Sequence, residues 1–68
     1  MREHECYWIV NKATQEKIEY HGTFLPAFNA CEVLNMHERR HGRIAMHESS
    51  YQLQRVDKST GKILGVFI

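Results

Sequence analysis

The chain has 68 residues, 43% of them hydrophobic and 25% charged, and nine Lys and Arg against eight Asp and Glu give a net charge of +1. This length and composition predict one folded domain over residues 1–68 rather than a disordered tail. The near-balance of charge disfavours a dedicated non-specific nucleic-acid binder, and no apolar run reaches the roughly 18 residues of a membrane span.

The N-terminal segment and the cysteines bear on the compartment. Residues 1–5 mix charges and contain no apolar stretch typical of a secretory signal, so we expect a flexible N-terminus and a cytoplasmic protein. Two cysteines, Cys6 and Cys31, are too few for a disulfide framework and are expected to be reduced thiols. Nothing in the sequence calls for a cofactor, and none is predicted.

Strand-like segments surround one predicted helix. β-Branched and aromatic content or alternation predicts five strands, at residues 6–11, 17–22, 43–48, 51–56 and 62–68. Pro26 suits the first turn of a helix and Gly42 suits the residue after its last turn, so these two residues delimit the helix. The predicted fold class is α+β, in the order β-β-α-β-β-β, with an antiparallel sheet and one helix packed on one face.

The turns of the two predicted hairpins resemble each other in sequence. Residues 10–15 (Val-Asn-Lys-Ala-Thr-Gln) align with residues 56–61 (Val-Asp-Lys-Ser-Thr-Gly). In the second turn, Asp57 can cap its own backbone and Gly61 can supply the left-handed residue that such loops need. A duplicated ancestor or convergence on a good hairpin loop explains the similarity, and convergence is favoured.

The predicted helix has an apolar face that runs into a histidine-containing string. At 100° per residue, one face collects Ala27, Ala30, Cys31, Leu34, His37, Glu38 and His41. Arg39 and Arg40 then point away from that face. We expect Cys31 to be a small core residue, and the histidines to interact with the dipole at the helix C-terminus.

Residues 37–41, His-Glu-Arg-Arg-His, match the H-E-x-x-H pattern in which two histidines ligate zinc and the glutamate acts as a general base. With a third histidine added, the string resembles the metzincin pattern, which implies a zinc hydrolase with His37, His41 and His47 as ligands. It departs from that pattern at Ile44, where the family has glycine. The two arginines between the histidines favour solvent over a buried helix beneath a cleft. We therefore predict no enzyme and keep a zinc-binding domain as an alternative.

Basic residues are the more suggestive functional feature. Arg39, Arg40 and Arg43 cluster around the end of the predicted helix, and Lys12 and Lys58 lie in the two hairpin turns. Arginine suits phosphates, carboxylates and protein interfaces, so these five residues are the predicted partner contacts. The alternative interpretation is a solvated helix end favoured by the dipole.

A sheet with a single helix leaves its second face uncovered, and the last predicted strand is apolar on both faces. A homodimer or a partner protein would cover such a surface, and the last strand could also pair with another chain. Four aromatic residues could stack on nucleic-acid bases if exposed there, and would otherwise belong to the core: Tyr7, Trp8, Tyr20 and Tyr51.

In its element order, its length and its lack of a catalytic constellation, the chain resembles small proteins of phages and mobile elements, including some anti-CRISPR inhibitors of type I systems. The resemblance implies a sheet-plus-helix domain that docks on a crRNA-guided surveillance complex, and it carries over no functional residue. The leading prediction is a non-enzymatic binding protein that docks on a larger protein or nucleoprotein complex. The alternative is a small nucleic-acid-binding regulator that uses the same arginines on phosphates.

Overall fold

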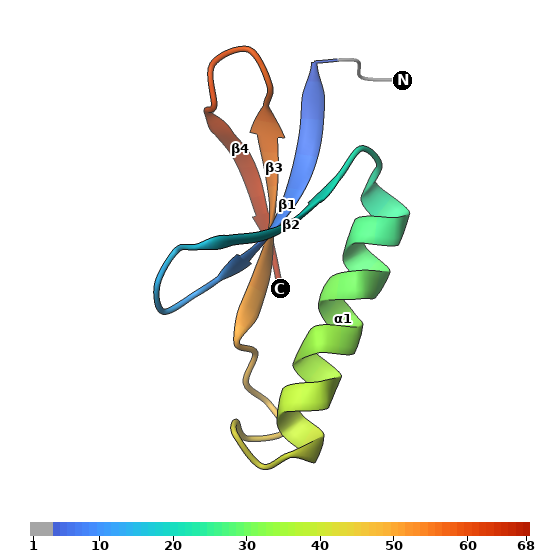
Figure 1. Ribbon diagram of the computed structural model, residues 1–68, viewed down its shortest axis with the longest axis vertical. Coiled ribbons are helices and arrows are strands. Elements are labelled where there is room, and N and C mark those ends of the chain that lie inside the picture. Colours follow the sequence, from blue (N-terminus) through green and yellow to red (C-terminus); the bar gives the residue numbers. More distant parts are fainter. Residues whose placement is uncertain (1–3) are drawn as a thin grey trace.

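A computed structural model describes residues 4–68 as one four-stranded sheet and one helix (Figure 1). Along the chain the elements are β1 (Glu5–Asn11), β2 (Lys17–His21), α1 (Phe24–Arg40), β3 (Tyr51–Asp57) and β4 (Ile63–Phe67). The strand order across the sheet is β2-β1-β3-β4, and every neighbouring pair is antiparallel. The predicted α+β class, an antiparallel sheet with one helix packed on one face, is confirmed.

The β1–β2 and β3–β4 turns have the same structure. Asn11 and Asp57 each accept a hydrogen bond at the side-chain oxygen from the backbone N–H two residues ahead, at 2.9 and 2.8 Å. The N–H of Gln15 donates to the carbonyl of Asn11 at 2.7 Å, and that of Gly61 donates to the carbonyl of Asp57 at 2.8 Å. Both donors have left-handed backbone, with φ of 61° at Gln15 and 77° at Gly61. The capping role predicted for Asp57 and the left-handed role predicted for Gly61 are confirmed.

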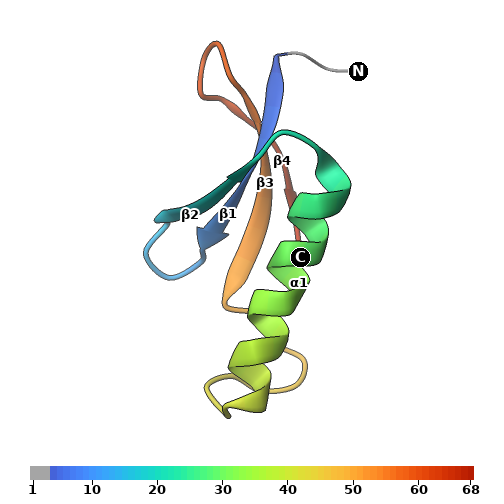
Figure 2. The same ribbon diagram turned by 45° about the vertical axis from the view of Figure 1, so that its right-hand side comes forward.

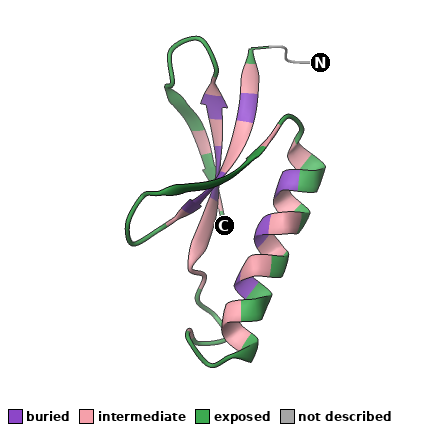
Figure 3. Cartoon of the chain, in the orientation of Figure 1, coloured by how far each residue is buried: buried purple, intermediate pink, exposed green. Residues whose placement is uncertain are grey.

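The core lies between α1 and the sheet face formed by alternate residues of β1 and β3 (Figures 1 and 3). The fully buried side chains at its centre are Ile9, Ala27, Cys31 and Leu53. Three aromatic rings, those of Tyr7, Phe28 and Phe67, pack around Phe24 with centroids 5.3–5.6 Å from its own. The prediction of Cys31 as a small core residue is confirmed.

The buried stripe of α1 consists of Ala27, Cys31 and Asn35 at four-residue spacing, and Figure 3 shows it as bands on the side facing the sheet. Each four-residue step overshoots a full turn by about 40°, so the stripe drifts around the helix. This drift carries the buried side away from His37 and His41. The prediction that the core-facing stripe continues through these two histidines is wrong, since both are exposed.

The sheet face opposite α1 carries one row that crosses all four strands, Tyr20–Trp8–Gln54–Val66. Trp8 is packed within this row, because the Tyr20 ring meets it edge-on with centroids 5.3 Å apart, and Lys17 Nζ lies 5.3 Å from its ring centroid. Tyr20 and Val66, at the two ends of the row, are 48% and 53% exposed. As predicted, the helix covers only one face of the sheet.

The strand predicted over residues 43–48 is wrong, because the structure places this segment in the loop 41–50 between α1 and β3. Glu48 closes a turn there. Its N–H donates to the Ala45 carbonyl at 3.0 Å, and its Oε1 accepts from the Ala45 N–H at 2.8 Å. Met46 is 81% exposed, so the segment buries no apolar face that would hold it on the sheet. The loop folds back beside the C-terminal end of α1, beyond the sheet (Figures 1 and 2).

The start of the chain is anchored from His4 onward, and residues 1–3 of the segment expected to be flexible lie outside the described residues. The carbonyl of His4 accepts a hydrogen bond from the Lys58 N–H at 2.7 Å. Glu5 begins β1, with a carboxylate oxygen 3.7 Å from Arg55 Nε. Among the residues that the structure describes, no helix has both the length and the apolar content of a membrane crossing.

Candidate binding surface at the end of the helix

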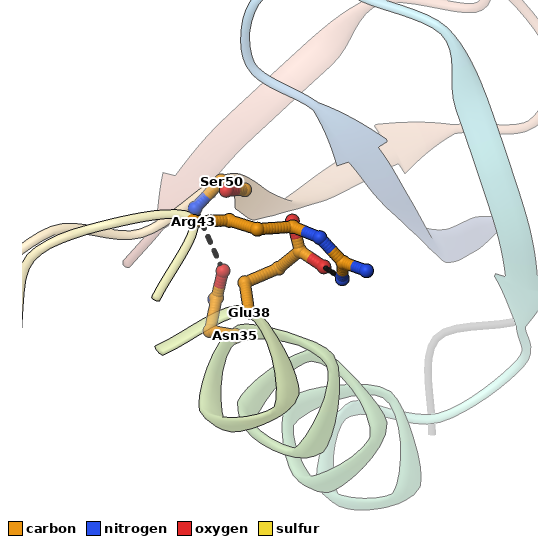
Figure 4. A network of polar contacts seen from close by, with 4 residues as sticks. All are labelled: Asn35, Glu38, Arg43 and Ser50. Carbon is orange, nitrogen blue, oxygen red and sulfur yellow. Dashed lines mark hydrogen bonds and ion pairs between the residues drawn. The ribbon is translucent and has the colours of Figure 1, made fainter. Parts of the chain in front are cut away.

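A buried asparagine ties the helix to the start of β3. Asn35 is fully buried on α1, and its Oδ1 accepts hydrogen bonds from the N–H groups of Ser50 at 2.8 Å and Tyr51 at 2.9 Å. Its Nδ2 donates to the Tyr51 carbonyl at 3.1 Å. Figure 4 shows the side chain reaching from the helix to the chain at Ser50. A buried amide side chain is normally hydrogen-bonded, and in these three bonds its partners are backbone groups where the loop 41–50 meets β3. The three bonds therefore fix the end of this loop, at Ser50 and Tyr51, against the helix.

The entry of the loop is fixed by the end of the helix itself. Gly42 has a left-handed backbone with φ of 70°, and its N–H donates to the Arg39 carbonyl at 3.1 Å. The N–H of Arg43 donates to the Glu38 carbonyl at 3.0 Å. Together these two bonds form a Schellman motif, which satisfies carbonyls that a helix end leaves open. The predicted role of Gly42 as the residue just past the helix is confirmed.

Two of the three predicted arginines hold the loop in place. Arg43 Nη1 donates to Glu38 Oε2 at 2.7 Å, an ion pair seen in Figure 4. Arg39 is half-buried rather than pointing away from the fold, and its Nε donates to the Glu48 carbonyl at 3.0 Å. Arg40 is exposed, and within the described part of the chain it forms no hydrogen bond or ion pair. Its guanidinium is therefore available to another molecule.

Lys12 belongs to the same end of the molecule, whereas Lys58 does not. Lys12 Nζ donates to Ser49 Oγ at 2.5 Å, and its N–H donates to the Ser50 carbonyl at 3.0 Å, which joins the β1–β2 turn to the end of the loop. Lys58 lies in the β3–β4 turn, at the opposite end of a molecule 38 Å long (Figures 1 and 2). The structure thus brings together four of the five predicted contacts and sets Lys58 apart.

We use the name helix-end surface for Lys12, Glu38, Arg39, Arg40 and the loop 41–50, which contains Arg43. It holds these four cations against two carboxylates, and both carboxylates, those of Glu38 and Glu48, already form the internal contacts given above. Met46 projects from the loop with 81% of its surface exposed, the largest exposure among the bulky hydrophobic residues that the structure describes. The result is an ordered surface with excess positive charge and one apolar projection.

The H-E-x-x-H string lies beside this surface and does not form the zinc arrangement. The rings of His37 and His41 are exposed, with centroids 4.3 Å apart. Glu38, the general base of the zinc pattern, is paired with Arg43 instead. In the part of the chain that the structure describes, no three His, Cys, Asp or Glu side chains are placed to hold a metal ion, so His47 does not join the pair.

Cys31 lies on the core-facing side of α1, one turn before Asn35. The distance from Asn35 Nδ2 to Cys31 Sγ is 3.8 Å. Burial, followed by the nearby charge of Glu32, raises the pKa of the Cys31 thiol to about 11, and Lys12 acts in the opposite direction. A thiol with this pKa is protonated near neutral pH, and the protonated form is neither a good nucleophile nor a good metal ligand. Cys31 therefore contributes packing to the core rather than chemistry to the surface.

Sequence reasoning missed two residues that matter for this surface: Asn35, which holds the loop from beneath, and Met46, which projects from it. Asn35 follows Ala27 and Cys31 at the same four-residue spacing, so a polar residue in line with an apolar stripe was the available signal. Met46 carried no such signal, because its exposure depends on the turn that Glu48 closes.

In comparisons with known proteins, no family model matches the chain, and no match is found among curated proteins or solved structures.

Proposed function

We propose that the chain is a non-enzymatic binding protein that docks on a larger protein or nucleoprotein complex through the helix-end surface. The observation that carries the proposal is the exposure of Met46 on a loop that bonds from Asn35, Arg39 and Glu48 hold in one arrangement. A bulky apolar side chain displayed on an ordered loop contributes nothing to the core. Burial of this side chain beneath a partner would remove its apolar surface from water, which favours binding.

The chemistry around Met46 suits a protein partner with an acidic surface. Methionine and arginine are both enriched at protein interfaces, and the flexible thioether adapts to the shape of a partner. The free guanidinium of Arg40 offers a planar set of donors that matches a carboxylate. Because the loop is already ordered by its internal bonds, docking loses little conformational entropy.

A small nucleic-acid-binding regulator is the second candidate, and the excess positive charge of the helix-end surface favours it, since phosphates would neutralise that charge. Two of the arginines are less available for this purpose, because Arg39 and Arg43 are engaged with Glu48 and Glu38. The net charge of +1 for the whole chain also gives little long-range attraction to a polyanion.

The aromatic residues give limited support to base stacking. Tyr7 and Tyr51 pack against the core on the helix side of the sheet. Trp8 lies on the open face, but Tyr20 packs against its ring and Lys17 lies over it. A base would have to displace these neighbours before it could stack on the indole, which weakens the nucleic-acid proposal relative to the protein one.

A narrower form of the leading proposal makes the partner a crRNA-guided surveillance complex, so that the chain would act as a phage-type inhibitor. Its support is the element order and small size of the chain, and the observed order β-β-α-β-β has one strand fewer than the order on which the resemblance was based. The same binding experiment tests both forms, because the identity of the captured partner distinguishes them.

Affinity capture from a bacterial lysate tests the proposal. The baits are the wild-type chain, the double variant Arg40→Glu/Met46→Ser, and Lys58→Glu as a charge reversal at the far end of the molecule. We expect the wild type and Lys58→Glu to retain the same partner and the double variant to lose it. If all three retain the same proteins, the helix-end surface is not the docking site.

Salt dependence separates the two candidate functions. A phosphate-binding regulator loses affinity steeply as salt rises, and its loss follows the number of neutralised phosphates. A protein interface centred on Met46 depends mainly on apolar burial and changes less with salt. A shift of DNA or RNA by the wild type at low salt, absent in Arg40→Glu, would favour the nucleic-acid regulator.

A further inference from the structure

Both outer strands of the sheet have one edge that no described element covers. The strand order β2-β1-β3-β4 places β2 and β4 at the two edges. The outer backbone N–H and C=O groups of an edge strand can accept another strand, so natural proteins normally protect such edges with charge, proline or irregular geometry.

The two edges differ in how well they are protected. β2 reads Lys-Ile-Glu-Tyr-His, and its Glu19 and His21 side chains contact each other along one face of the strand. β4 reads Ile-Leu-Gly-Val-Phe and contains no charged residue and no proline. A strand pairing with β2 would have to accommodate its charges, whereas a strand pairing with β4 would meet only apolar side chains.

The apolar side chains of β4 lie on both faces of the sheet, and Phe67 on the helix side is half-buried against the core. Phe67 lies opposite Leu53 on the helix side, and Val66 lies opposite Gln54 on the open side. Exposed fractions are 49% for Ile63, 37% for Leu64 and 53% for Val66. The β4 edge can therefore bind another strand in two ways. It offers unpaired backbone hydrogen-bonding groups, and it offers an apolar surface that pairing would cover.

The geometry points to β4 as a self-association edge, with β4 of a second copy of this chain as its occupant. A second copy is the partner that fits, because an uncharged strand can lie antiparallel to itself around a two-fold axis without placing like charges together. Pairing would join two four-stranded sheets into one continuous sheet. A chain of 68 residues also has a small core, which association would extend.

The irregularity in β4 sets the register of this pairing. A bulge lies where Arg55 pairs with Gly65 but Val56 pairs with Ile63, so Leu64 is the extra residue. The regular part of the strand is Gly65–Phe67, which is centred on Val66. Symmetric antiparallel pairing of this part places Val66 directly opposite Val66 of the second copy.

Two single substitutions in the same cross-strand row test the assignment. Val66→Lys puts two like charges opposite each other in the dimer, and the half-exposed position can hold a lysine in the monomer. Tyr20→Lys is the matched control, because Tyr20 ends the same row on the same face at the other edge and is similarly exposed. Circular dichroism and thermal unfolding verify that both variants remain folded.

The measurement is molar mass by light scattering over a range of protein concentrations. We expect the wild type and Tyr20→Lys to approach twice the 8.0 kDa of one chain as concentration rises. Folded Val66→Lys is expected to remain at the mass of one chain, with dimerisation weakened by roughly tenfold or more.

Two results would overturn the assignment. One is a wild-type chain that stays monomeric at the highest concentration reached. The other is a dimer that Tyr20→Lys disrupts as strongly as Val66→Lys, which would place the contact on the open face of the sheet instead. Neither result bears on the helix-end surface, which contains no residue of β4.

Discussion

The side-chain amide of Asn35 on the helix and the backbone of Tyr51 on β3 exchange two hydrogen bonds, in the way that two paired strands do. The N–H of Tyr51 donates to Asn35 Oδ1 at 2.9 Å, and Asn35 Nδ2 donates to the Tyr51 carbonyl at 3.1 Å. One side-chain amide thus supplies both the acceptor and the donor that the start of β3 needs. This pairing makes the loop 41–50 an ordered part of the fold.

Replacing Asn35 by alanine should destabilise the protein by about 2–4 kcal/mol, because the backbone groups of Ser50 and Tyr51 lose partners in a buried setting. Urea unfolding measures this change. Asn29→Ala on the exposed side of α1 is the matched control and should be neutral or slightly stabilising, since alanine favours helix. Equal effects of the two substitutions would show that the Asn35 bonds contribute little.

The two similar turns predict opposite effects for reciprocal substitutions. Gln15 holds φ at 61° without being glycine, so Gln15→Gly should stabilise the protein by roughly 0.5–1 kcal/mol. Its side chain also donates to the Lys12 carbonyl at 3.1 Å, and loss of that exposed bond offsets a small part of the gain. Gly61→Gln should destabilise by about 1 kcal/mol. Thermal unfolding of both variants checks the pair, and destabilisation by Gln15→Gly would contradict it.

The turns also show why part of the fold follows from the sequence. Asn11 and Asp57 cap their turns through bonds to residues two positions ahead, and Gly61 supplies a conformation that its own chemistry allows. These causes are local, so the sequence pattern predicts them. The Schellman end of the helix at Gly42 is local for the same reason.

The errors have a largely non-local cause. The strand expected over 43–48 rested on the alternation of Ile44 and Met46, but the backbone there is held by Glu48 and by Arg39 from the helix. The contact between Glu48 and Ala45 is local, whereas the contact from Arg39 forms only because the helix lies beside the loop. The position of the helix on the sheet also determines where the buried stripe drifts, which is why the two histidines proved exposed. It likewise decides that Lys12, and not Lys58, lies at the same end as the three arginines.

Stability should decrease above pH 9 because of Cys31. Its thiol has a pKa of about 11 in the fold, raised from 9.0, so the unfolded chain loses this proton first as pH rises. The contribution of Cys31 is fully present below pH 9 and is lost between pH 9 and 11. The free energy of unfolding measured across that range should fall more steeply for the wild type than for Cys31→Ala. Parallel profiles for the two proteins would contradict this assignment.

Metal removal should leave the fold unchanged. Structural zinc normally has four protein ligands, whereas His37 and His41 provide two exposed imidazoles and Glu38 is bound to Arg43. We expect the same Tm with and without a chelator, and no stoichiometric zinc in the purified protein by elemental analysis. A fall of several degrees in Tm with chelator, absent in His37→Asn, would revive the zinc-binding alternative.

The most direct test of the docking proposal is quantitative capture by three baits, with mass spectrometry of what each retains. A hot-spot contribution from Arg40 and Met46 predicts that Arg40→Glu/Met46→Ser loses the partner by about 30-fold or more, while Lys58→Glu retains it as the wild type does. Thermal unfolding confirms beforehand that all three baits are folded. A partner retained equally by the folded double variant and the wild type would contradict the assignment of docking to the helix-end surface.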